Sequence, residues 1–160
     1  MIPLLTSHPL SFEEYVGQSK PLFTIHNFFS TFKKGKALLL QGPSGTGKTS
    51  SIHLYAKLND YDLLELNASD ARNQKNLEDF LSKVTGQMSL FATKKIIRLD
   101  EIDGLSGTKD RGALTSLLKF IKSSPFPIVM TGIDLSDKKF SPVKKESLVV
   151  SFSPIPPKDL

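Results

Sequence analysis

The residues best suited to chemistry form one glycine-rich segment, which reads Gly42-Pro43-Ser44-Gly45-Thr46-Gly47-Lys48-Thr49. The segment fills every fixed position of the pattern G-x-x-x-x-G-K-[ST] and follows an apolar run at 37–40. Glycines let such a loop fold tightly, so that its N–H groups point at phosphate oxygens. We expect Lys48 to reach the β- and γ-phosphates of ATP and the Thr49 hydroxyl to bind Mg²⁺. Ser50 also belongs to the predicted nucleotide-binding residues. The alternative, a plain glycine-rich turn, is disfavoured by the complete pattern.

Two adjacent carboxylates, Asp100 and Glu101, follow a second apolar run at 96–99. At the tip of a strand beside a phosphate loop, an Asp can hold Mg²⁺ through its water shell. A Glu that follows directly can orient the attacking water or accept its proton. An Asp-Glu pair alone is more often a solvated turn, but this pair lies about 50 residues beyond the loop with one strand between. We therefore predict an ATP- and Mg²⁺-dependent hydrolysis site with Glu101 and Lys48 as catalytic residues.

The spacing of apolar residues predicts alternating helices and strands that would position these two segments. Helices are expected near 20–32, 49–58, 76–84 and 111–122, and strands at 37–41, 62–66, 95–99, 127–131 and 147–152. Short, nearly continuous apolar strands that alternate with helices indicate a parallel sheet covered on both faces. Ligands of such sheets bind at the carboxyl ends of the strands, where the loop and the acidic pair both fall. The predicted fold class is α/β, a three-layer sandwich around a five-stranded parallel sheet.

Composition narrows the class of protein without identifying it. The chain has 160 residues, of which 39% are hydrophobic and 23% charged, as is ordinary for a single globular domain. No apolar run approaches the roughly 18 residues that a membrane span needs, so we expect no membrane partner. The absence of cysteine excludes disulfides and thiolate metal sites and fits a reducing compartment. The net charge of +5 is compatible with a polyanionic partner, although each lysine cluster can equally be a solvated face.

Three further motifs are distinctive. They are Pro9-Leu10-Ser11-Phe12-Glu13-Glu14-Tyr15-Val16-Gly17-Gln18, Leu66-Asn67-Ala68-Ser69-Asp70, and Asp100-Glu101-Ile102-Asp103-Gly104-Leu105-Ser106-Gly107 with Asp110-Arg111-Gly112-Ala113-Leu114 behind it. Together they resemble the AAA+ subunits of replication factor C, the sliding-clamp loader. The third is similar to the large subunit in particular, and the resemblance covers about residues 9–153. It implies a P-loop NTPase fold of the AAA+ type.

The resemblance also implies roles for residues outside the phosphate loop. The N-terminal segment 1–18 would lie against the adenine, with Val16 and Gly17 among the nucleotide-binding residues. Arg72 and Arg111 would contact DNA phosphates without reading bases, although each can equally be a surface arginine in a local ion pair. The implied partners are clamp-loader small subunits, a sliding clamp and primer-template DNA. The implied location is the cytoplasm of an archaeal-type cell, or a nucleus.

Two departures from the family pattern bear on catalysis. The family usually has Thr-Ala-Asn-Asp where this chain has Thr131-Gly132-Ile133-Asp134, so Ile133 stands where an Asn senses the γ-phosphate. Lys145-Glu146-Ser147 stands in place of the arginine finger of the small subunits, as expected of a large subunit. The family's helical lid is expected to be absent from these residues. In this interpretation, 1–153 is the ATPase base domain and 154–160 begins the linker to the lid.

The sequence leaves two classes of function open. The first is the ATP-binding and hydrolysing core of a clamp-loader large subunit, a weak ATPase in isolation, which loads a ring clamp onto primed DNA. The alternative is a nucleotide-binding assembly or adaptor module of an AAA+ complex, with little or no hydrolysis of its own. Ile133 favours the alternative, and the intact phosphate loop and acidic pair oppose it. Another AAA+ machine, such as a helicase loader, is disfavoured by the motifs at 67–70 and 110–114.

Overall fold

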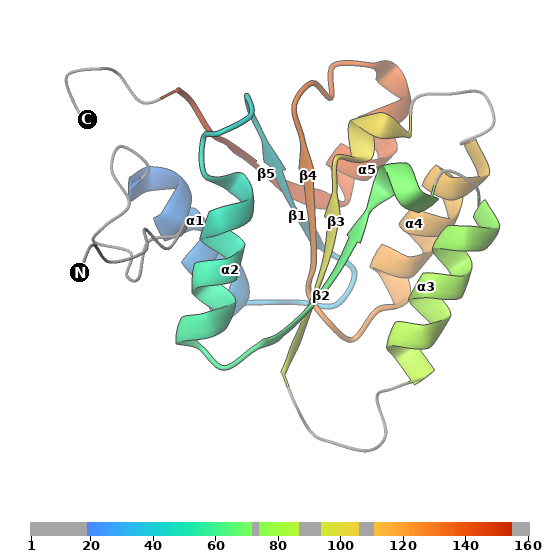
Figure 1. The fold of residues 1–160 in the computed structure, drawn as a ribbon, viewed down its shortest axis with the longest axis horizontal. Helices are drawn as coiled ribbons and strands as arrows, with labels where there is room; N and C mark the ends of the chain where they lie inside the picture. Colours follow the sequence, from blue (N-terminus) through green and yellow to red (C-terminus); the bar gives the residue numbers. More distant parts are fainter. Residues whose placement is uncertain (1–18, 72–73, 87–93, 106–110, 155–160) are drawn as a thin grey trace, which may run out of the picture.

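A five-stranded parallel sheet forms the centre of the computed structural model, which describes residues 19–71, 74–86, 94–105 and 111–154 (Figure 1). The strands are β1 (Ala37–Gln41), β2 (Asp62–Asn67), β3 (Lys95–Asp100), β4 (Ile128–Gly132) and β5 (Ser147–Ser151). Their order across the sheet is β2-β3-β4-β1-β5, and every neighbouring pair is parallel. The predicted α/β class and five-stranded parallel sheet are confirmed.

Helices cover both faces of this sheet. They are α1 (Ser19–Ser30), α2 (Lys48–Leu58), α3 (Gln74–Gly86), α4 (Arg111–Ser123) and the short α5 (Ser141–Lys145), with single 3₁₀ turns η2 (Ala68–Ala71), η4 (Ile102–Gly104) and η6 (Lys138–Phe140). Helices α1 and α2 lie on one face, and α3, α4 and α5 on the other (Figure 1). Because side chains alternate along a strand, Leu38 and Leu40 pack on the α1/α2 side, whereas Leu39 packs on the opposite side. The result is a three-layer sandwich with one apolar core on each face.

One helix is shorter than the sequence-based expectation, and one short helix was not expected. Helix α1 ends at Ser30, earlier than the expected end at 32. Phe32 still packs against the core beside Phe28, with ring centroids 6.0 Å apart, so the apolar periodicity continues past the last helical residue. Helix α5 was not predicted, because its five residues hold too few apolar positions to show a helical period.

The strand order decides which residues meet at the carboxyl edge of the sheet. Strand β4 lies between β3 and β1, so the end of β4 separates the acidic pair from the phosphate loop. The register places Leu40 of β1 beside Thr131 of β4. None of the described helices has the length and hydropathy needed to cross a bilayer.

Candidate functional site

The glycine-rich segment connects the end of β1 to the start of α2 in a tight loop. Gly42 has φ +146°, and a Cβ at this position would lie 2.2 Å from the carbonyl oxygen of Phe152. Gly47 has φ +97° and immediately precedes α2. The Thr46 hydroxyl donates a hydrogen bond of 2.8 Å to the Pro43 carbonyl and closes the loop. The first residues of α2 therefore face the loop, where the helix dipole favours an anion.

The loop and the acidic pair line one cavity of about 200 Å³, although they are far apart in the sequence. From the loop and α2 the lining residues are Ser44, Gly45, Gly47, Lys48, Thr49 and Ser50, and from the ends of β3 and β4 they are Asp100, Glu101, Thr131, Gly132 and Ile133. Of the other predicted site residues, Gly42, Pro43 and Thr46 belong to the loop without lining the cavity. Val16, Gly17, Arg72 and the side chain of Arg111 lie outside what the structure describes.

Lys48 is buried at the start of α2 and bonds to its own loop. Its Nζ donates hydrogen bonds to the carbonyl oxygens of Gly42 and Pro43. Burial lowers the pKa of Lys48, and the nearby carboxylates of Asp103, Asp100 and Glu101 partly offset that shift. An ammonium that is partly desolvated and bound to carbonyl oxygens is well suited to exchange them for phosphate oxygens.

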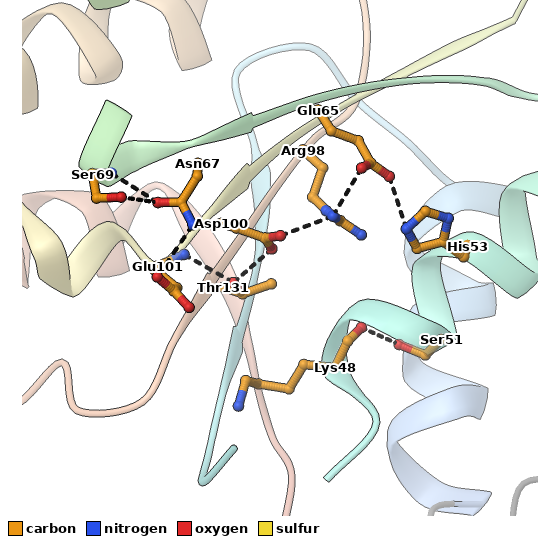
Figure 2. A network of polar contacts seen from close by, with 10 residues as sticks. All are labelled: Lys48, Ser51, His53, Glu65, Asn67, Ser69, Arg98, Asp100, Glu101 and Thr131. Carbon is orange, nitrogen blue, oxygen red and sulfur yellow. Dashed lines mark hydrogen bonds and ion pairs between the residues drawn. The ribbon is translucent and has the colours of Figure 1, made fainter. Parts of the chain in front are cut away.

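Thr131 joins the two members of the acidic pair. Its hydroxyl donates a 2.9 Å hydrogen bond to Asp100 Oδ1 and accepts one of 3.1 Å from the Glu101 backbone N–H (Figure 2). Glu101 has φ +57°, a left-handed conformation that is uncommon outside glycine. The Thr131 contact thus holds the backbone turn between Asp100 and Glu101. Because of this turn, the two carboxylates point in different directions.

Asn67 and Asp103 are polar residues that contact the lining of the cavity, and no sequence pattern assigned either of them a role. Asn67 Nδ2 donates to Glu101 Oε2 at 3.2 Å, while its Oδ1 accepts from the backbone N–H and the hydroxyl of Ser69 (Figure 2). Asp103 Oδ2 accepts from the backbone N–H groups of Ile133, at 2.9 Å, and Asp134, at 3.2 Å. The place of Asn67 in the motif at 66–70 was the sequence feature that could have indicated a role for it. Its hydrogen bond to Glu101, however, depends on β2 lying beside β3.

A chain of polar side chains, Arg98, Glu65 and His53, lies behind Asp100. Arg98 Nη2 is 2.8 Å from Asp100 Oδ2 and 3.1 Å from Glu65 Oε2, and Glu65 Oε1 is 2.8 Å from His53 Nε2 (Figure 2). These residues come from β3, β2 and α2. In the sequence, Arg98 stands within an apolar run, and no local pattern indicates this network.

The oxygen donors of the cavity fit a magnesium ion that arrives with a nucleotide. The Thr49 hydroxyl and the Asp100 carboxylate are hard ligands, and the Asp100 side chain is 20% exposed. Among the described residues, no group of three or more His, Cys, Asp or Glu side chains could hold a metal by itself. Mg²⁺ characteristically combines one or two carboxylates with substrate phosphates, so this sparse protein ligand set suits a metal–nucleotide complex.

Comparison with known proteins agrees with this geometry. Residues 38–137 match the family described as "ATPase family associated with various cellular activities (AAA)". The replication factor C large subunit of Nanoarchaeum equitans is 38% identical over 98% of this chain and 37% of its own length. That of Staphylothermus marinus is 34% identical over 98% of this chain and 38% of its own. The chain therefore spans a little over a third of the curated relatives that it matches.

A solved structure shares the fold. The Orc1 protein of Aeropyrum pernix, determined in complex with DNA, superposes with a TM-score of 0.71. The match covers 98% of this chain and 50% of that chain, at 18% sequence identity. At this identity, the likeness concerns the fold alone.

Proposed function

Because this chain belongs to the AAA family of ATPases, we propose that it is the ATP-binding and hydrolysing core of a clamp-loader large subunit. The observation that carries the proposal is the meeting of the phosphate loop and the acidic pair in one cavity. The similarity to replication factor C large subunits extends over nearly the whole chain and supports the more specific role. Loading of a ring clamp onto primed DNA would then be the work of the assembled complex.

In this proposal the chain's own residues bind and orient the nucleotide. Lys48 leaves the carbonyl oxygens of Gly42 and Pro43 and binds the β- and γ-phosphates, assisted by loop N–H groups and the α2 N-terminus. Thr49 and Asp100 would hold Mg²⁺, which neutralises charge on the phosphate oxygens. Glu101 orients the attacking water, and Asn67 fixes one oxygen of the Glu101 carboxylate. Val16 and Gly17 remain proposed contacts on the adenine side.

A second function, a nucleotide-binding adaptor with little hydrolysis, is favoured by two features of the cavity. Ile133 lines the cavity with a half-exposed side chain that cannot donate a hydrogen bond to a γ-phosphate. Of the described residues that line the cavity, Lys48 carries the single positive charge. Measured turnover in the assembled complex, with and without Glu101→Gln, separates the two functions: the adaptor shows no difference.

We propose that the partners are clamp-loader small subunits, a sliding clamp and primer-template DNA. The test is affinity purification of the full-length protein from its host, with ATP present. Recovery of a ring clamp together with small AAA+ subunits is the expected result. Recovery of a different assembly with neither component would contradict the clamp-loader assignment while leaving ATP binding untouched.

Arg72 and Arg111 are the proposed DNA contacts within that assembly. Phosphate contacts release counterions, so affinity for DNA should fall steeply between low and physiological salt and should not depend on sequence. The double variant Arg72→Ala/Arg111→Ala should flatten this salt dependence, measured by fluorescence anisotropy on a labelled primer-template. An unchanged slope would show that DNA binds elsewhere on the protein, and the lysine clusters would be the next candidates.

A further inference from the structure

Arg98 is a buried cation directly behind the proposed magnesium site. It lies in β3, two residues before Asp100, so that both side chains lie on the same face of the sheet. It is 4% exposed and is surrounded by the apolar core beneath α1 and α2, which includes Ile96 and Val129. A charged side chain in such a position is expensive unless it is paired.

Only part of the Arg98 guanidinium is paired with carboxylates among the described residues. A single nitrogen, Nη2, contacts both Asp100 and Glu65, and among the described residues Nε and Nη1 have no hydrogen-bond partner. An apolar residue of similar volume would avoid the cost of those two buried donors. The stability of the fold therefore does not explain an arginine at this position. The effect of its charge on Asp100 is the remaining explanation.

Asp100 and Lys48 line the same cavity but are not bonded to each other in the structure. Both oxygens of Asp100 are engaged, Oδ1 by Thr131 and Oδ2 by Arg98. The Lys48 ammonium instead binds the carbonyls of Gly42 and Pro43, and Figure 2 shows its Nζ directed away from Asp100. In a partly desolvated cavity, an unrestrained carboxylate would attract this ammonium strongly.

We propose that Arg98 is a positioning residue that holds Asp100 away from Lys48, so that Lys48 stays available for phosphates and Asp100 for the metal. Glu65 holds Arg98 from the other side, and His53 holds Glu65. Glu65 also offsets the charge of Arg98, which leaves Asp100 its own negative charge toward the metal. The inference rests on the proposed nucleotide site and adds to it a division of charge between the two residues.

The test is a thermodynamic cycle on ATP affinity measured by calorimetry in excess EDTA, where neither Mg²⁺ nor hydrolysis contributes. Four forms of the chain are compared: wild type, Arg98→Met, Asp100→Asn and the double variant. Arg98→Met should weaken ATP binding roughly five- to tenfold, because Asp100 is freed to pair with Lys48. Asp100→Asn in the same chain should remove that loss completely, so that the double variant binds like Asp100→Asn alone.

Lys95→Met is the matched control. Lys95 is a second buried cation, 5% exposed, at the opposite end of β3 and away from the cavity. Its substitution should leave ATP affinity in EDTA unchanged. Thermal unfolding without nucleotide reports whether each variant is folded, and Arg98→Gln replaces Arg98→Met in the cycle if the methionine variant does not fold.

The outcomes separate this inference from the proposed function. Multiplicative effects of Arg98→Met and Asp100→Asn, or an Arg98→Met affinity equal to that of wild type, would overturn the positioning role and leave the ATP site intact. Failure of the wild-type chain to bind ATP at all would overturn the proposed function, and this inference with it.

Discussion

At the residue scale, Lys48 is the side chain on which we propose that nucleotide binding most depends. Lys48→Ala removes a charge-assisted contact to phosphate and should cost roughly 2–3 kcal/mol of ATP binding free energy. Calorimetric titration of wild type and variant with ATP and Mg²⁺ measures the difference. An unchanged affinity would show that ATP binds elsewhere.

Lys48 should also make the affinity for ATP depend on pH. Burial lowers the pKa of Lys48, and bound phosphates favour its charged form. ATP affinity should therefore fall as the pH rises above the pKa of Lys48 in the free protein, starting at a lower pH than an ordinary lysine would give. Lys48→Ala is the control, since it should abolish this alkaline decline; a decline that persists in the variant would assign it to another group.

We expect the two residues of the acidic pair to have different roles, Asp100 in binding the metal and Glu101 in orienting the attacking water. Glu101→Gln keeps the shape and the Asn67 contact but loses the base, so it should bind ATP normally and slow hydrolysis in the assembled complex. Asp100→Asn should instead raise the Mg²⁺ concentration needed for tight ATP binding. Titration of Mg²⁺ at fixed ATP, together with turnover, measures both effects. Identical behaviour of the two variants would refute separate roles.

At the scale of elements, the junction of β1, the phosphate loop and the end of β5 admits only glycine at position 42. Gly42→Ala would place a Cβ against the Phe152 carbonyl and should lower the free energy of unfolding by roughly 2 kcal/mol or more, with loss of ATP binding. Gly45 is the matched control, because its φ is also positive, +75°, but nothing lies within 4 Å of an added Cβ.

Gly45→Ala should therefore lower the free energy of unfolding by only about 1 kcal/mol, which is the cost of a left-handed backbone conformation for alanine. Urea denaturation of both variants gives the comparison. Equal losses of stability would mean that the backbone conformation alone, and not the contact with Phe152, constrains the loop.

The strands were predicted from sequence to within a residue or so at each end, because continuous apolar runs mark buried parallel strands. The phosphate loop and acidic pair were predicted from their patterns, and their meeting followed from the rule that parallel strands present ligands at their carboxyl ends. The contacts of Arg98 with Glu65 and of Asn67 with Glu101 were not predicted. Both depend on β2 lying in register beside β3, which no local pattern encodes.

At the scale of the whole molecule, the proposed nucleotide site lacks part of the charge needed for hydrolysis. Lys48 is the single cation among the described residues of the cavity, and Ile133 occupies the position where the family resemblance implies an Asn. Charge stabilisation of the transferring phosphate is the main contribution to catalysis in this class of enzyme. An arginine supplied by a neighbouring subunit is typically worth ~10³–10⁵ in rate.

The most direct test is steady-state phosphate release by the purified, monomeric 160-residue chain at saturating ATP and Mg²⁺. We expect wild type to turn over barely above background, at a rate close to that of Glu101→Gln, while calorimetry on the same sample shows that ATP is bound. Addition of small clamp-loader subunits to the full-length protein should then raise the rate. Vigorous turnover by the isolated chain, abolished by Glu101→Gln, would contradict the account, because the chain would then complete its own active site.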